Sequence, residues 1–307
     1  MNKITLALIG ASLLAPVGRG GAAALVSQPA VVAQSFPGSR PGAGSSVRRP
    51  PFTGLPAPVS GPGKACATQQ PAVPTDAREV VAENQKRTDA QSQHYEGTLK
   101  VVDAKGRVSD KRWIFDRLGS HGASKAVLRF TEPAEVKGVA LLIVNHPDRA
   151  SDQWMWTPAI QRDRRIALQD RSTRFFGTDF SFEDLEERDV DQFEYRMLGE
   201  EAVDGAACWK IESKPGSRKT SQYTSSILWI RRDNYAFARI ENSIKSEIVR
   251  RLVYQKIENV QSIWTARVLE MTDLRRNSRT ILTLEKLAYN VPMREDDFTL
   301  QALRRER

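Results

Sequence analysis

Apolar and polar side chains alternate along most of the chain between about residues 95 and 289. In residues 95–101 an apolar residue or glycine occupies every second position, the period of a strand with one buried face. The same signal predicts strands at 113–115, 126–130, 139–144, 153–157, 193–200, 207–212, 223–231, 236–242, 248–254, 264–271 and 280–287. Short polar turns such as Asp204-Gly205 separate the runs, and such short connections favour antiparallel neighbours. We therefore expect one large antiparallel meander of about ten or eleven strands.

Only two segments have a helical pattern. Residues 76–92 form an amphipathic pattern that Asp76 can cap, with Glu79 three residues on. Residues 160–190 contain a second short candidate, with Ser181 as its cap. A sheet of this size must cover its apolar face, and these are the available covers. The predicted fold class is α+β: a strongly curved half-barrel sheet with a few helices on its concave face.

The first 74 residues differ from the rest. Residues 1–24 resemble a secretory signal, with Lys3, an apolar run over 4–17 and small residues at 22–24; a retained membrane anchor is the alternative. Residues 25–74 are rich in Pro, Gly, Ser and Ala and contain no acid, which predicts a disordered linker. Residues 75–307 then form the folded domain.

Charge does not indicate a nucleic-acid partner. The net charge is +9, but residues 1–74 hold six basic groups and no acid, so 40 basic groups face 37 acidic ones in the rest. Basic runs there are interleaved with acids, and we expect no nucleic-acid binding. The two cysteines, Cys66 and Cys208, form no zinc pattern; free thiols or one optional bridge are both open.

The usual motifs of catalysis and metal binding do not occur in the sequence. It contains no G-x-S-x-G, H-E-x-x-H, P-loop or dinucleotide fingerprint. The three histidines, His94, His121 and His146, have no ligand spacing. The acidic cluster in residues 183–189 fits a solvated helix face better than acid–base pairs. We predict no enzyme activity, no cofactor and no metal site.

Residues 131–187 are the most distinctive stretch. They contain TEPAEVKGVALL at 131–142, DQWMWTPA at 152–159 and FFGTDFSFEDL at 175–185. Together with a closing YNVP and DFTL at 289–300, this combination resembles the outer-membrane lipoprotein-sorting protein family, whose members have the fold of the periplasmic lipoprotein carrier LolA. The resemblance covers most of residues 76–303 and leaves the Pro-rich stretch outside.

The resemblance implies an open half-barrel closed by helices, a periplasmic location in a Gram-negative envelope and a hydrophobic cavity for lipid or lipoprotein cargo. It also implies an inner-membrane transporter of the resistance–nodulation–division type as partner. The alternative function is a sensor or interaction module of the envelope that binds another protein through its sheet edge.

Large aromatic side chains are the predicted cavity wall, with ordinary core packing as the alternative for each. The candidates are Trp113, Phe115, Trp154, Trp156, Phe175, Phe176 and Trp229. Trp154 and Trp156 are two apart and so share a face, which we expect to point inward, with Gln153 and Met155 on the other face.

A set of charges in the same region has two interpretations. The candidates are Arg162, Arg164, Arg165, Asp179 and Asp184. They form either a rim for lipid headgroups or phosphate, or internal ion pairs with Arg171, Arg174 and Glu183. Ion pairs are favoured because both signs occur within one segment, and Arg164 or Arg165 is expected to approach Asp179 or Asp184.

Overall fold

The computed structural model describes residues 76–305. The predicted signal, the predicted linker and Cys66 lie outside these residues. The signal and the linker therefore remain predictions. No helix in the described part is long and apolar enough to cross a membrane.

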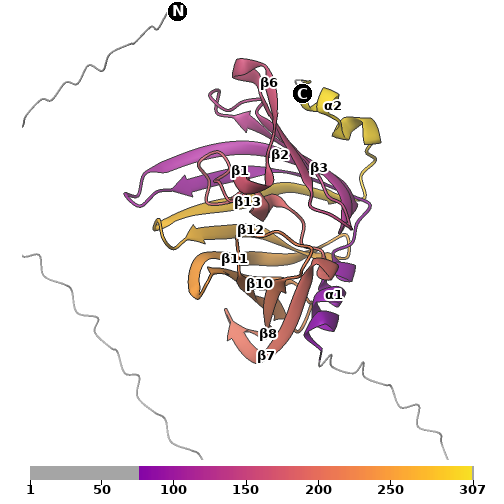
Figure 1. The fold of residues 1–307 in the computed structure, drawn as a ribbon, viewed down its shortest axis with the longest axis vertical. Helices are drawn as coiled ribbons and strands as arrows, with labels where there is room; N and C mark the ends of the chain where they lie inside the picture. Colours follow the sequence, from indigo (N-terminus) through magenta and orange to yellow (C-terminus); the bar gives the residue numbers. More distant parts are fainter. Residues whose placement is uncertain (1–75, 306–307) are drawn as a thin grey trace, which may run out of the picture. The chain divides into compact units, whose positions relative to one another are not determined.

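The fold is dominated by one antiparallel sheet of thirteen strands (Figure 1). The strands are β1 (Ser92–Val102), β2 (Val108–Ser120), β3 (Ala123–Glu132), β4 (Ala140–Val144), β5 (Asp152–Thr157), β6 (Arg162–Arg165), β7 (Phe193–Val203), β8 (Ala206–Pro215), β9 (Ser225–Arg231), β10 (Phe237–Ile244), β11 (Glu247–Val260), β12 (Ile263–Asp273) and β13 (Ser278–Tyr289). The predicted antiparallel half-barrel is confirmed, with more strands than expected. The pattern missed β6 because all four of its residues are charged.

The strand order explains why one segment crosses the sheet. It runs β6-β5-β4-β3-β2-β1-β13-β12-β11-β10-β9-β8-β7, so the chain starts in the middle and builds outward to β6. It resumes at the opposite edge, β7, and returns until β13 pairs with β1. Residues 166–192 must therefore span the sheet. We call them the crossing segment.

The helices are few and short. Helix α1 (Ala77–Arg87) begins where Asp76 accepts a hydrogen bond of 2.9 Å from the Arg78 amide, as predicted, and ends before Thr88. Helix α2 (Leu300–Leu303) is near the C-terminus. Single 3-10 turns lie at Pro158–Ile160, Leu168–Asp170, Glu183–Leu185, Val190–Gln192 and Glu295–Phe298. The helix expected near Ser181 is thus one 3-10 turn.

The two faces of the sheet are covered by different segments. On the face that we call inner, strands β1–β4 and β13 pack against Ile166, Phe175 and Phe182 of the crossing segment. Strands β8–β10 pack on the same face against Val80 and neighbouring residues of α1. The opposite, outer face of β3–β5 is covered by residues 293–303, with Leu303 fully buried. Separate apolar clusters therefore lie on the two sides of the β3–β5 region.

Candidate ligand-binding cavity

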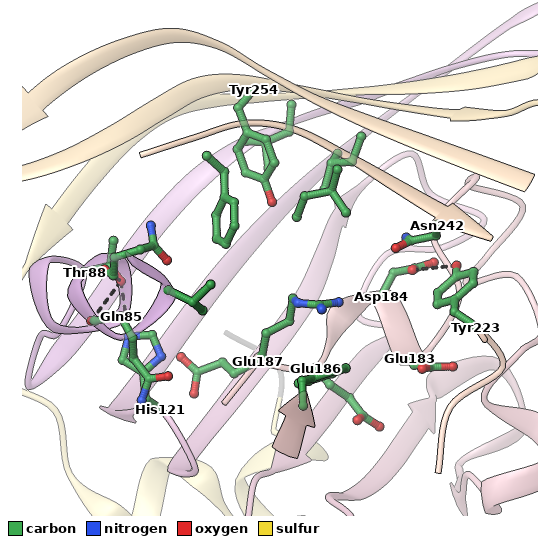
Figure 2. A pocket seen from close by; sticks show the side chains of 18 of the residues that line it. Gln85, Thr88, His121, Glu183, Asp184, Glu186, Glu187, Tyr223, Asn242 and Tyr254 are labelled. Carbon is green, nitrogen blue, oxygen red and sulfur yellow. Dashed lines mark hydrogen bonds between the residues drawn. The ribbon is translucent and has the colours of Figure 1, made fainter. Parts of the chain in front are cut away.

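A cavity of about 410 Å³ lies between the inner face of the sheet, α1 and the crossing segment (Figure 2). A second cavity of about 230 Å³ adjoins it under β12, β13 and β1, and the two share eight lining residues, among them Phe237, Tyr254 and Leu269. The larger volume alone is within the usual range of small-molecule sites. The two cavities therefore form one candidate site with two compartments.

The sheet provides the apolar wall of this site. Alternate residues of β10–β13 point inward because side chains of a strand alternate between its faces. The strand residues of the apolar and aromatic lining are Tyr95, Phe193, Tyr195, Phe237, Ile240, Leu252, Tyr254, Trp264, Ala266, Leu269, Met271, Leu282, Leu284 and Tyr289. Helix α1 adds Val81, and the loops before β9 and β10 add Tyr223 and Ala236. In Figure 2, Tyr254 points from the sheet toward the crossing segment.

The crossing segment provides a charged wall opposite. Glu186 pairs with Lys219 at 2.8 Å and with Arg171 at 2.7 Å, and its side chain is almost fully buried. Glu187 pairs with Arg117 of β2, which is also buried. These ion pairs join the crossing segment to β2 and to the loop before β9. The site therefore has one apolar side and one side on which most charges are compensated by ion pairs.

Glu183 is the exception among the carboxylates of this wall. It accepts hydrogen bonds from the Ser221 hydroxyl and, at 2.9 Å, from the Gln222 amide. Burial raises its pKa above the ordinary value of a glutamate, and the hydrogen bonds only partly oppose this. Glu183 thus retains a proton more readily than an exposed glutamate.

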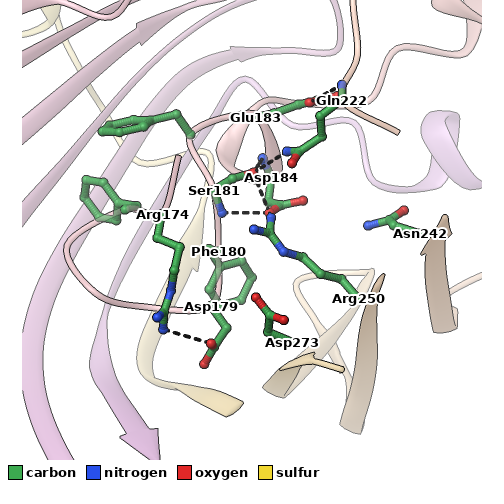
Figure 3. A network of polar contacts seen from close by, with 12 residues as sticks. Arg174, Asp179, Phe180, Ser181, Glu183, Asp184, Gln222, Asn242, Arg250 and Asp273 are labelled. Atoms are coloured by element: carbon green, nitrogen blue, oxygen red, sulfur yellow. Dashed lines mark hydrogen bonds and ion pairs between the residues drawn. The ribbon is translucent and has the colours of Figure 1, made fainter. Parts of the chain in front are cut away.

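A second network fastens the crossing segment to the middle of the sheet (Figure 3). Asp184 accepts from the Ser181 hydroxyl at 2.7 Å, from the Tyr223 hydroxyl at 2.8 Å and from Arg250 of β11. Asp179 is fully buried and pairs with Arg174 at 2.9 Å. It also accepts hydrogen bonds from Ser278 and Thr280 of β13. These contacts join the crossing segment to β11, to β13 and to the loop before β9.

Burial also affects the cavity tyrosines. It raises the pKa of Tyr195 to about 12 and that of Tyr254 above the ordinary range, so both hydroxyls keep their protons at neutral pH. Burial lowers the pKa of His121, which lines both compartments, so its neutral form is favoured. The site presents hydroxyl donors rather than phenolates.

The seven predicted aromatic residues do not line these two cavities. Trp113, Phe115, Phe175 and Phe176 are in or against the inner-face core beside them. Their role as ligand contacts therefore stays a prediction, and their observed packing is that of a core.

The other three aromatic candidates are on the outer face. Trp154 and Trp156 share a face, as predicted, but they pack under residues 293–303, whereas Met155 packs in the inner core. The predicted direction is therefore wrong, because the period of a strand defines two faces without saying which one is inner. Trp229 packs with Cys208 on the face opposite to the inner-facing Leu228 and Ile230.

The predicted charges divide between ion pairs and solvent. Asp179 and Asp184 are both paired internally, as the ion-pair interpretation requires. Arg165 contacts Asp152 across the β5–β6 hairpin, so the expected approach to Asp179 or Asp184 is wrong. Arg162 and Arg164 are exposed on the edge strand β6. The acidic cluster of residues 183–189 is mostly ion-paired and partly buried rather than solvated.

Sequence reasoning missed the residues that line the site. Phe237, Tyr254, Leu269 and Met271 were placed on strands, but they have the same alternation as any half-buried strand. Their place at the cavity depends on where the crossing segment leaves a gap. No group of His, Cys, Asp and Glu side chains in residues 76–305 has the arrangement of a metal site, and Cys208 is a buried free thiol.

Sequence comparison with known proteins gives a match to a protein-family model. A family model described as "Uncharacterized protein" matches residues 122–305. No protein of curated function matches the sequence significantly.

Solved structures share the fold over nearly their whole length. An outer membrane lipoprotein-sorting protein domain from Vibrio parahaemolyticus is 24% identical with a TM-score of 0.71, covering 75% of this chain and 98% of its own. A DUF1329 family protein from Desulfovibrio piger is 25% identical with a TM-score of 0.71, covering 74% and 97%. A LolA superfamily protein from Nitrosomonas europaea is 17% identical with a TM-score of 0.59, covering 74% and 98%.

These proteins have the half-barrel that the motifs in residues 131–187 led us to expect. The chain belongs to the family whose model matches residues 122–305, and it has the LolA-like fold of the outer-membrane lipoprotein-sorting proteins.

Proposed function

We propose that this protein binds a lipid, or the lipid part of a lipoprotein, in the inner-face cavities and carries it through the periplasm. The observation that carries the proposal is the pair of adjoining cavities between an apolar sheet face and a charged wall. The lipoprotein-sorting and LolA names of proteins with the same fold support it. The pathway is outer-membrane lipoprotein sorting or a transporter-linked lipid pathway.

The physical reason is the cost of exposing an acyl chain to water. Each methylene that leaves water gains about 0.8 kcal/mol, so a chain of roughly 16 carbons gains on the order of 12 kcal/mol. A carrier must offer a dry surface of similar size and still release its cargo. The apolar wall offers such a surface, and most charged groups of the wall that faces it are already held in ion pairs.

Export and a transporter partner belong to the same proposal. The predicted signal in residues 1–24 and linker in 25–74 would deliver the domain to the periplasm, near a transporter of the resistance–nodulation–division type. N-terminal sequencing of protein from a periplasmic extract tests the export step. A mature chain that starts near residue 25 is expected; an intact Met1 in the membrane pellet contradicts it.

A cavity-filling variant tests ligand binding. Leu269 lines both compartments, so Leu269→Trp should reduce the affinity for a fluorescent fatty-acid probe at least tenfold. Val108→Trp adds the same side chain at a position that is 56% exposed and should leave the affinity unchanged. Native mass spectrometry of protein from an envelope fraction should show a bound lipid. Probe binding that is equal in both variants would refute the proposal.

A second candidate function is an envelope interaction module. Strand β7, eleven residues long, is an edge of the sheet and pairs only with β8 in the described residues. Such an edge can accept a strand of another protein. A partner that protects the β7 amides from hydrogen exchange, together with a cavity that holds no lipid, would favour this function over the carrier.

A further inference from the structure

One of the three basic side chains that line the larger cavity has no acidic partner. Arg117 pairs with Glu187, and Lys219 pairs with Glu186 at 2.8 Å. No carboxylate of residues 76–305 is within ion-pair distance of Arg188. Its guanidinium donates to the Ser213 hydroxyl at 3.0 Å and lies 4.2 Å from the centre of the Phe193 ring. Arg188 therefore contributes a positive charge to the cavity that the described carboxylates do not neutralise by contact.

Two tyrosine hydroxyls lie in the same compartment. Tyr195 of β7 and Tyr254 of β11 both line the larger cavity, and neither hydroxyl makes a hydrogen bond to another described residue. The positive charge of Arg188 acts on both tyrosines, since it opposes the rise that burial causes in each pKa. The guanidinium and the two O–H donors thus belong to the lining of the same compartment.

This combination is suited to an oxyanion. A guanidinium offers a planar fork of N–H donors that matches carboxylate and phosphate oxygens. A partly buried charge without a counter-ion is unfavourable, and an incoming anion removes that cost. The four carboxylates on the same wall already have partners. Ion pairs engage Asp184 with Arg250, Glu186 with Arg171 and Lys219, and Glu187 with Arg117, while Glu183 accepts hydrogen bonds from Ser221 and Gln222. They leave Arg188 as the available charge.

The second compartment provides a place for a chain attached to that anion. It shares Tyr254 and Leu269 with the first compartment and continues under β12 and β13. Its further walls include Trp264, Leu282 and Leu284, and Arg188 is not among the residues that line it. An amphiphile can therefore place its head in the larger compartment and its tail in the smaller one.

We propose that the ligand is an amphiphile with an acidic headgroup, a carboxylate or a phosphate, which Arg188 binds with Tyr195 and Tyr254 as further donors. The proposal rests on the carrier function above and specifies its ligand class. The two sources of this chemistry are a fatty acid and a phosphate-headed lipid with one chain.

Three probes of equal chain length separate the headgroup from the tail. They are palmitate, hexadecyl phosphate and the uncharged hexadecanol, each measured by displacement of the same fluorescent probe. Wild-type protein should bind the two acids at least tenfold more tightly than the alcohol. The tighter of the two acids identifies the source of the headgroup.

Variants assign the preference to Arg188. Arg188→Gln should weaken both acids roughly ten- to a hundredfold, the range for a hydrogen-bonded charge, and change the alcohol less than twofold. Arg218→Gln removes an exposed arginine and should change none of the three. Tyr254→Phe removes one donor from a side chain that otherwise keeps its packing, and it should weaken the acids at least threefold.

The outcomes distinguish the two proposals. If wild-type protein binds none of the probes, the carrier function itself fails. If all three bind equally, or if Arg188→Gln weakens acids and alcohol alike, the cavity binds lipid but the headgroup assignment is wrong. Should Arg188→Gln not fold, the Tyr254→Phe result decides: unchanged affinity for both acids overturns the assignment.

Discussion

The buried ion pair between Asp184 and Arg250 offers the sharpest test of how the crossing segment is held. The two side chains are 5% and 8% exposed, and 66 residues separate them along the chain. We expect Asp184→Asn to destabilise the protein, although the substitution only replaces one carboxylate oxygen by an amide nitrogen. The amide can still accept from Ser181, but it leaves the guanidinium of Arg250 without its counter-ion.

The expected cost follows from this geometry. Removing one partner of a buried ion pair lowers the free energy of unfolding by about 3–5 kcal/mol, because the remaining charge is left uncompensated in a site with little water. For a domain of this size, that loss lowers the Tm by about 6–20 °C. Replacing both partners removes the uncompensated charge. The double variant Asp184→Asn with Arg250→Met should therefore be more stable than the sum of the single changes implies, with a coupling energy of about 1–3 kcal/mol.

Guanidinium chloride unfolding of the four proteins in this cycle measures the effect. Asp110→Asn, at an exposed position on β2, is the matched control and should lie within about 0.5 kcal/mol of wild type. A cost below about 1 kcal/mol for Asp184→Asn, or strictly additive single changes, would show that the pair does not fasten the crossing segment to β11.

Three further predictions concern other parts of the chain. Trp156→Ala should cost at most about 3 kcal/mol, since the ring is partly exposed on the outer face, and should leave probe affinity within twofold; a large loss of affinity would contradict its placement. Burial raises the pKa of Glu183, so its contribution to stability is present at low pH and lost as pH rises through the raised value. Glu183→Gln should therefore gain free energy of unfolding relative to wild type between about pH 4 and pH 7, and a flat difference would refute this. Deleting residues 25–70 should leave the Tm within about 2 °C, and a drop of about ten degrees would show that they pack on the domain.

In the β5 region, the sequence predicted the strand correctly but predicted the wrong direction for its two tryptophan side chains. The DQWMWT motif forms β5 as expected, and Trp154 and Trp156 share a face. The C-terminal residues 293–303 cover that face, and Arg129 donates to the Leu303 carbonyl at 2.9 Å beneath them. Nothing in the local pattern of residues 152–157 indicates a cover that comes from 140 residues further along the chain.

Local patterns were sufficient for the fold because they reflect local physics. The period of two, the short polar turns and the Asp76 cap predicted the antiparallel sheet and α1 without reference to distant residues. Strand β6 was not predicted, because it has no apolar residue and therefore no alternation of apolar and polar positions. The motifs of residues 131–187 added the half-barrel by resemblance.

The cavity, in contrast, was decided only by the tertiary structure. Alternation defines two faces of each strand, and their assignment as inner or outer depends on which distant segment packs against them. The partners of Asp184 and Glu187 come from β11 and β2, so neither pair could be read from the local charge pattern. Arg188 is one charge among many in the sequence. It becomes a candidate ligand contact only because the crossing segment places it in the same cavity as Tyr254, while the neighbouring acids are paired elsewhere.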